Sequence, residues 1–219
     1  MKKLIMSLVV LCSFVVVNAQ ETSWMEKNFS LSGEIRTGSS YASLFGAKLS
    51  DDWSLFYMLD IQHKSGFGIG MYRFTDFQEE GLGRLSFFDA YWSGTLSKTV
   101  SLYAAMEYGF FDNDRGLDFL CPYAMLFWDA KVVNVTLASM YSYYLKTEPH
   151  EFIMKGQLSK EIINGTILEL SGWYHSELQK HFFWSIGVNQ KLLKNFYLQL
   201  DYLQKEGTSN FLAGVGYKF

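Results

Sequence analysis

The chain has 219 residues and a formal net charge of −3, and aromatic residues make up 18% of it, with 14 Tyr, 19 Phe and 6 Trp. No basic stretch is concentrated enough to suggest nucleic-acid binding. The few histidines and cysteines show no metal-binding spacing, and there is no glycine-rich phosphate loop, so we expect no metal and no cofactor.

The first 19 residues have the features of a secretory signal peptide. Met1-Lys2-Lys3 is basic, Leu4 to Val17 is apolar, and Val17-Asn18-Ala19 supplies small residues for cleavage. Loss of the two lysines would take the net charge from −3 to −5. We therefore expect residues 1–19 to be a signal peptide and residues 20–219 to be the mature domain. That domain contains a single cysteine, Cys121, and so no intrachain disulfide.

Most of the remaining chain alternates between apolar and polar residues with period 2. Phe29 to Thr37 is typical, with Leu31 and Ile35 on one face and Glu34 and Arg36 on the other. Segments of this kind predict strands near residues 29–37, 41–49, 53–62, 85–96, 99–109, 121–130, 132–144, 151–160, 165–175, 180–190, 195–204 and 209–219. This makes twelve strands, an even number, which places both ends of the domain on the periplasmic side of a membrane barrel.

Three similar tight turns predict how the strands are connected. Leu49–Leu55, Leu96–Leu102 and Leu192–Leu198 each place a short polar turn between alternating segments. Short turns are typical of the periplasmic side of bacterial barrels, and longer loops of the outer side. With these turns as guides, the alternating segment 66–74 is assigned to the longest outer loop, 63–84.

The faces of the strands differ in the way expected of a transmembrane barrel. Leu55, Tyr57, Leu59 and Ile61 form one apolar face, and the corresponding faces of strands 99–109 and 180–190 are also apolar. No stretch beyond the leader is long and apolar enough for a transmembrane helix. In lipid every backbone polar group must be paired, and only closure of the sheet leaves no free edge. A soluble two-sheet sandwich would show a similar period.

The opposite faces gather polar and ionisable residues that we expect to line the lumen. The selectivity candidates are Glu34, Arg36, Asp60, Asp89, Tyr91, Tyr103, Glu107, Lys155, Glu169, Trp173, His175 and Asp201; further lumen residues are Lys48, His181, Asn189, Tyr197, Gln199 and Lys218. Because Lys48 and Lys218 fall near the periplasmic ends of their strands, the wall at mid-depth is predicted to be acidic. Such residues can form a selectivity zone for solutes, or they can plug the lumen by satisfying one another.

The last strand of the chain favours the membrane alternative. Phe211, Val215, Tyr217 and Phe219 lie on one face, and the chain stops on the final aromatic residue. This pattern resembles the terminal strand of Gram-negative outer-membrane β-barrels, where it serves as the assembly signal. The resemblance implies a location in the outer membrane, contact with its lipid, and recognition by the barrel-assembly machinery. The predicted fold is thus all-β, a closed antiparallel transmembrane barrel of about twelve strands.

A further resemblance concerns the function. Phe88–Trp92, the 96–102 turn, Glu107–Gly109, Met140–Tyr144, Lys146, the strand from Phe152 to Gly156 and Gly216–Phe219 are similar to segments of the nucleoside-specific channel-forming (Tsx-like) family. The resemblance implies a twelve-stranded pore with a narrow, aromatic and polar lumen that passes nucleosides. No diagnostic substrate motif of that family can be aligned. The sequence therefore favours a passive channel for small polar solutes, nucleoside-like or cationic.

Two other classes of protein fit parts of the sequence. His63-Lys64-Ser65 has the His-x-Ser spacing of outer-membrane acyl hydrolases and is predicted to point outward near the outer rim. A serine of this kind needs a general base and a third group that orients the base. Gly66 follows the serine and no Asn occurs before Asn113, so an enzyme is not expected. The third class is a structural or binding barrel that uses its outer loops.

Overall fold

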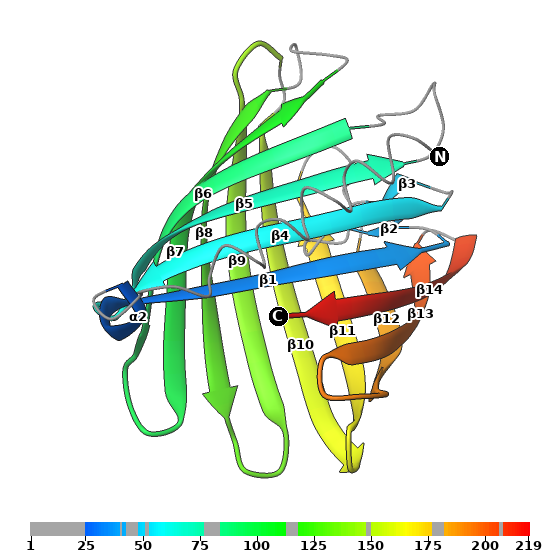
Figure 1. The fold of residues 1–219 in the computed structure, drawn as a ribbon. Helices are drawn as coiled ribbons and strands as arrows, with labels where there is room; N and C mark the ends of the chain where they lie inside the picture. The colour runs from blue at the N-terminus through cyan, green and yellow to red at the C-terminus, as the bar shows by residue number, and fades with distance from the viewer. Residues whose placement is uncertain are drawn as a thin grey trace, which may run out of the picture.

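Twelve antiparallel strands close into a barrel in the computed structural model (Figure 1). The structure describes residues 25–39, 41–42, 48–50, 53–76, 84–112, 118–147, 150–176, 182–205 and 208–219. The barrel strands are β1 (Phe29–Gly38), β4 (Ser54–His63), β5 (Phe67–Asp76), β6 (Arg84–Thr95), β7 (Val100–Phe111), β8 (Phe119–Asp129), β9 (Asn134–Tyr144), β10 (Glu151–Ile163), β11 (Thr166–His175), β12 (Phe182–Lys191), β13 (Phe196–Lys205) and β14 (Thr208–Lys218). Each strand pairs with its neighbour along this order, and β1 closes the barrel against β14.

Two small elements lie outside this order. A short helix, α2 (Met25–Asn28), leads into β1, and β2 (Tyr41–Ala42) pairs with β3 (Lys48–Ser50) in a separate two-stranded sheet. No helix in the described residues has the length and hydropathy needed to cross a membrane.

The two ends of the barrel differ in their connections. At the end where β1 begins and β14 stops, the connections are the tight turns 64–66, 96–99, 130–133, 164–165 and 192–195; we call it the turn end. Gly66 and Gly165 have φ values of +93° and +77°, which only glycine adopts easily. The opposite, loop end carries the connections 39–53, 77–83, 112–118, 145–150, 176–181 and 206–207.

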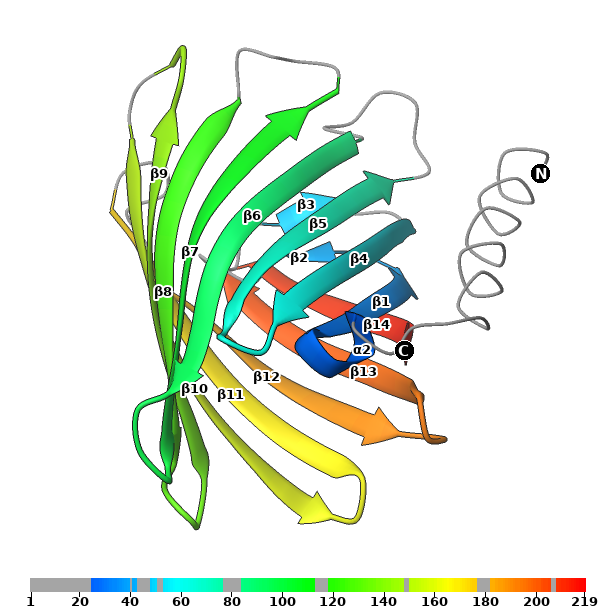
Figure 2. The same cartoon turned by 60° about the vertical axis from the view of Figure 1, so that its left-hand side comes forward.

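The outer and inner faces of the wall have the chemistry expected of a membrane barrel. On β10 the side chains of Phe152, Met154 and Leu158 are exposed on the outside, whereas Ile153 and Lys155 are buried in the interior. The predicted facing of β4 holds too, because inward Asp60 accepts a hydrogen bond from inward Tyr91 on β6, two strands along the same wall. Figure 2 shows the curved wall of β6–β9 facing β13, β14 and β1 across that interior. The large apolar surface thus lies outside, where hydrocarbon can cover it.

Two assignments made from the sequence are wrong. The segment 41–49 is not a barrel strand, and the segment placed in an outer loop, 66–74, belongs to barrel strand β5. The two errors cancel, so the strand count of twelve is correct. The Leu49–Leu55 turn also lies at the loop end, since β4 starts there at Ser54.

Glycines explain why β5 was missed. Gly68 and Gly70 occupy inward positions of β5, where the polar and aromatic side chains of the pattern were expected. A Cβ at Gly68 would overlap the Tyr91 ring of β6, and one at Gly70 would overlap the Asp89 carboxylate. The neighbouring strand therefore supplies the side chains that fill this part of the interior, and the glycines make room for them.

The seam between β1 and β14 closes the barrel. The two strands pair from Glu34 to Gly38 on β1, opposite Lys218 to Gly214 on β14. Beyond that register, Gly33 and Phe219 exchange backbone hydrogen bonds of 3.1 and 3.0 Å. The Phe219 ring occupies the space that a Cβ at Gly33 would need. Phe211, Val215 and Phe219 are exposed on the outer face, as the sequence predicts.

These closing contacts predict a strong effect of Phe219 on assembly. Deleting Phe219 or changing it to Asp should leave most chains unassembled, because the closing hydrogen bonds or the lipid-facing ring are lost. The measurement is the fraction of protein that shifts on gels when heated. Lys218→Gln, one residue away on the exposed rim, should assemble normally. Wild-type assembly of the Phe219 variants would contradict a closing role for this residue.

Candidate functional site: the barrel lumen

One wall of the lumen holds a cluster of acids and tyrosines contributed by β4 to β8. We call it the tyrosine–acid cluster; it consists of Asp60, Tyr72, Asp89, Tyr91, Tyr103, Glu107 and Tyr123. Its centre is Asp89, which is 4% exposed. One oxygen, Oδ2, accepts hydrogen bonds from the hydroxyls of Tyr72 (3.1 Å), Tyr103 (2.7 Å) and Tyr123 (3.2 Å). Asp89 is therefore held from three neighbouring strands.

The rest of this cluster follows from strand register. Asp89 pairs with Glu107 on β7, so two carboxylates lie side by side on the inner face. Tyr91 donates a hydrogen bond of 2.6 Å to Asp60 on β4. The rings of Tyr91 and Tyr103 stack with centroids 4.8 Å apart, and those of Tyr103 and Tyr123 with centroids 5.6 Å apart. The stack forms an aromatic wall with its hydroxyls directed at carboxylates.

Nearer the loop end, the same side of the interior is filled by apolar side chains. The buried residues are Phe74, Leu85, Phe111, Phe119, Cys121, Tyr123, Ala138 and Ile153, and they form one packed cluster. Cys121 is fully buried among them and is the free cysteine of the described residues. Small barrels fill their interiors with side chains in this way. Open space for a solute must therefore be sought on the other side of the lumen.

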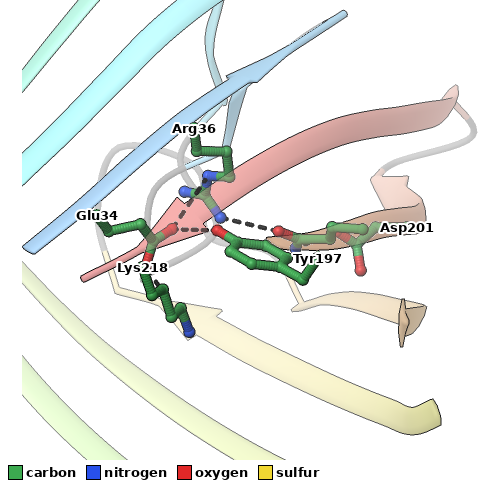
Figure 3. A network of polar contacts seen from close by, with 6 residues as sticks. Glu34, Arg36, Tyr197, Asp201 and Lys218 are labelled. Carbon is green, nitrogen blue, oxygen red and sulfur yellow. Dashed lines mark hydrogen bonds and ion pairs between the residues drawn. The ribbon is translucent and has the colours of Figure 1, made fainter. Parts of the chain in front are cut away.

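That other side carries a network of polar contacts on β1, β13 and β14 (Figure 3). Glu34 accepts a hydrogen bond from the Tyr197 hydroxyl and lies 3.8 Å from the Lys218 ammonium. Arg36 donates a hydrogen bond of 2.9 Å to the Gln199 side chain, which in turn donates one of 2.5 Å to Asp201. The network therefore fixes Arg36 beside the two carboxylates.

Beside this network lies a cavity of about 120 Å³, which we call the mixed-charge cavity. This is the space of about four water molecules. Its ionisable lining residues are Arg36 and Lys155 on the cationic side and Glu169 and Asp201 on the anionic side. Gln157, Ser171, Trp173, Ser185 and Gln199 add uncharged polar or aromatic groups. The cavity is thus electrically balanced and strongly polar.

Lys155 is held in an unusual way. Its residue is 8% exposed, and its ammonium lies 5.4 Å from the centre of the Trp173 ring. It forms no hydrogen bond or ion pair with any other residue that the structure describes. Glu169 likewise lacks a hydrogen bond or ion pair to a described residue. An ammonium that receives no hydrogen-bonding partner from the protein must be solvated by water or by another group, and the cavity that Lys155 lines is where such a group can lie.

The structure separates the selectivity candidates into three sets. Asp60, Asp89, Tyr91, Tyr103 and Glu107 belong to the tyrosine–acid cluster; Glu34, Arg36, Lys155, Glu169, Trp173 and Asp201 belong to the network and cavity. His175 stands apart near the loop end, where its Nδ1 lies 3.0 Å from Glu151 and both side chains are buried. His181 and the side chain of Lys48 lie outside the described residues.

Sequence reasoning missed several residues of these sets. Tyr72 was missed because its strand was assigned to a loop, although its alternation with Phe74 was visible. Tyr123, Glu151 and Gln157 occupy inward positions of strands that were predicted, so the same period could have found them. Nothing in the local sequence shows that Tyr72, Tyr103 and Tyr123 meet at one carboxylate oxygen.

The His63–Ser65 pair lies in the tight turn between β4 and β5, at the turn end, and the predicted outer-rim location is wrong. His63 Nδ1 is 2.8 Å from Ser65 Oγ, and the backbone N–H of Ser65 also donates to Nδ1, at 3.2 Å. The His63 ring packs against Phe29. Among the described residues, no carboxylate or amide side chain hydrogen-bonds His63. The contact is a side-chain cap of the turn and lacks the group that would orient a catalytic base.

No group of three or more His, Cys, Asp and Glu side chains in the described parts of the chain could hold a metal ion. The tyrosine–acid cluster offers carboxylates from Asp60, Asp89 and Glu107, but hydroxyls occupy the most buried of them.

Comparison with solved structures places the fold among outer-membrane porins. The KdgM porin superposes with a TM-score of 0.65 at 12% sequence identity, covering 86% of this chain and 99% of that one; the same values apply to the KdgM porin in complex with disordered oligogalacturonate. The NanC porin superposes with a TM-score of 0.60 at 14% identity, covering 85% and 98%.

At these identities the likeness concerns the fold. No protein-family model matches the chain, and no curated protein matches its sequence. The fold is therefore a closed twelve-stranded antiparallel barrel similar to that of solved porins. The predicted twelve-stranded barrel fold is confirmed, whereas membership of the Tsx-like family remains a hypothesis.

Proposed function

We propose that this protein is an outer-membrane channel that passes small polar solutes passively. The observation that carries the proposal is a closed barrel with an apolar outside and a charged cavity inside. The KdgM and NanC porins have a similar barrel fold. In this proposal the turn end faces the periplasm, as short turns do in other outer-membrane barrels, and the apolar outer face contacts lipid.

The same proposal assigns two roles to the C-terminal strand and the leader. Residues 1–19 direct export and are removed, and β14 is recognised by the barrel-assembly machinery through its outward face. The assembly residues are Phe211, Val215, Tyr217 and Phe219, which lie on the lipid-facing side of β14.

The charge of the lumen favours cations and neutral polar solutes over anions. Carboxylates of the described lumen candidates (Glu34, Asp60, Asp89, Glu107, Glu169 and Asp201) outnumber the cations Arg36, Lys155 and Lys218. Each galacturonate unit of the compound bound in the KdgM structure carries a carboxylate. A polyanion of that kind would be repelled by the excess of carboxylates here, so the proposal does not extend to it. A nucleoside-like solute stays within the proposal, because it is uncharged and can hydrogen-bond to the polar lining of the mixed-charge cavity.

Conductance in planar lipid bilayers tests the proposal. Purified protein, folded from the mature chain, should give steady single-channel openings in KCl. In a KCl gradient its reversal potential should show that K⁺ permeates better than Cl⁻. A barrel that assembles, as judged by its heat-dependent gel shift, but never conducts would overturn the channel.

The acidic wall predicts how the preference for cations arises. Changing Asp60 and Asp89 to Asn and Glu107 to Gln should move the reversal potential in a KCl gradient towards zero, because acidic groups of the lumen wall are replaced by neutral amides of similar shape. Asp129→Asn, at the last residue of β8 on the turn-end rim, is the control and should leave the reversal potential close to wild type. An unchanged reversal potential in the triple variant would place these carboxylates outside the ion path.

A further inference from the structure

We propose that the mixed-charge cavity is a binding site for small zwitterions, solutes that carry an ammonium and a carboxylate, such as a free amino acid. This inference rests on the proposed channel function and names the class of solute that the channel favours. Four charged side chains line the cavity, Arg36 and Lys155 against Glu169 and Asp201. They come from β1, β10, β11 and β13, so only the closed barrel brings them together.

The first step of the argument is that two opposite charges face the cavity with unsatisfied hydrogen-bonding capacity. The Lys155 side chain is mostly buried, and its ammonium lies over the Trp173 ring. The ammonium can donate three hydrogen bonds, but it makes none to a described residue. The Glu169 carboxylate accepts none from a described residue. No direct ion pair joins the two groups in the described part of the chain. A ligand between them can hydrogen-bond to both.

The second step is that the cavity disfavours simple ions. An anion near Lys155 would also meet Glu169 and Asp201, and a cation near Glu169 would also meet Lys155 and Arg36. For either ion, repulsion by the side chains of like charge cancels most of the attraction from the side chains of opposite charge. A zwitterion avoids this repulsion, because its carboxylate can lie towards Lys155 and Arg36 while its ammonium lies towards Glu169 and Asp201.

The third step concerns size and rigidity. A volume of about 120 Å³ holds a few waters or a solute of a few heavy atoms. The anionic side is held in place, because Asp201 is bonded through Gln199 to Arg36. Trp173 supports Lys155 through the face of its ring. Charged groups that are fixed before binding lose little conformational freedom when the ligand enters. This lowers the entropic cost of binding and favours a small solute.

The test compares two isomers that differ in charge separation but not in atoms. Glycine is a zwitterion, and glycolamide has the same formula and carries no charge. Initial swelling rates of proteoliposomes are measured in isosmotic glycine and glycolamide, with the rates of protein-free liposomes subtracted. The wild-type protein should favour glycine. Lys155→Met and Glu169→Gln should each lower the glycine-to-glycolamide ratio by about threefold to fivefold, the effect of losing one partly screened charge contact.

Controls separate this inference from folding and from the channel itself. Lys160→Met removes the same charge from the outer face of β10 and should keep the wild-type ratio. Lys155→Met should fold, since methionine keeps the mostly buried apolar part of the side chain and removes a charge that no described residue pairs. Conductance in KCl is measured for every variant. Absence of openings in the wild-type protein would defeat the proposed channel and the site together.

Two results would overturn the zwitterion site while leaving the channel intact. One is an equal glycine-to-glycolamide ratio in the wild type and both lumen variants, with KCl conductance preserved. The other is a glycine-to-glycolamide ratio that falls in Lys155→Met but stays level or rises in Glu169→Gln. The cavity would then interact only with the carboxylate of the solute. A fall in both variants, with Lys160→Met unchanged, supports the site.

Discussion

The Leu59→Arg variant should be less stable than wild type by about 2–4 kcal/mol, whereas Met58→Arg should be tolerated. Leu59 lies in the middle of β4 on the outer face, and its paired neighbours are Gly33 and Met71. Hydrocarbon offers a guanidinium no hydrogen-bonding partner. Met58 points into the lumen, where its paired neighbours are Glu34 and Tyr72. There a guanidinium can reach a carboxylate and water.

The measurement is the free energy of unfolding in urea for each variant in phospholipid vesicles. The two substitutions are matched, because they place the same charge on adjacent residues of one strand. Met58→Arg should mainly change single-channel conductance. Equal stability of the two variants would show that the two faces of β4 are not separated into lipid and lumen.

Loss of the Asp89 side chain should have the second large effect, a destabilisation of about 2–4 kcal/mol for Asp89→Ala. Three tyrosine hydroxyls donate to one oxygen of this carboxylate, and two of them, from Tyr103 and Tyr123, belong to the stacked wall. The substitution removes their common acceptor and leaves buried donors unsatisfied, and each such donor costs about 1–3 kcal/mol. The contact of 3.3 Å between Tyr123 and Tyr103 recovers part of this.

A graded series makes this prediction specific. Asp89→Asn keeps a carbonyl acceptor and should lose less stability than Asp89→Ala. Asp60→Ala deprives only the Tyr91 hydroxyl of its acceptor and should fall between wild type and Asp89→Ala. The free energies of unfolding in urea, measured in phospholipid vesicles, give the order of stability of these variants. If Asp89→Ala proved as stable as wild type, the tyrosines would be solvated independently of Asp89, and the cluster would have no structural role.

The alternation of residues along each strand was enough to predict which side chains face lipid and which face the lumen. On β4, β7 and β12 every residue assigned to the outer face lies there, because a strand turns successive side chains to opposite sides whatever its neighbours are. Strand β5 was the exception. Its inward Gly68 and Gly70 leave room for Tyr91 and Asp89. The local sequence around a glycine does not predict which side chain of a neighbouring strand will pack over it.

The candidate site was predictable as a set of residues but not as an arrangement. All twelve selectivity candidates lie on inner faces or in the interior contacts described above. Their grouping depends on register and on closure between β1 and β14, which join residues far apart in sequence. Arg36 and Gln199, for example, hydrogen-bond across 163 positions of the chain. No local pattern predicts that Arg36 belongs with Lys155 and Glu169 around one cavity, while Asp89 is enclosed by tyrosines.

The strand count of twelve was correct only because the errors at 41–49 and 66–74 cancelled. The sequence by itself determined the class of fold, the apolar outward face of the strands and the last strand as one edge of the closure. These depend on period-2 alternation and on the composition of the two faces, both of which are local. The tertiary structure decided which segment forms the third barrel strand, which end of the barrel carries His63 and Ser65, and how the lumen is divided. It is divided into a filled, tyrosine-lined side and an open, mixed-charge side. The reason is that hydrogen-bond register and barrel closure set these distances, and both are properties of strand pairs rather than of single strands.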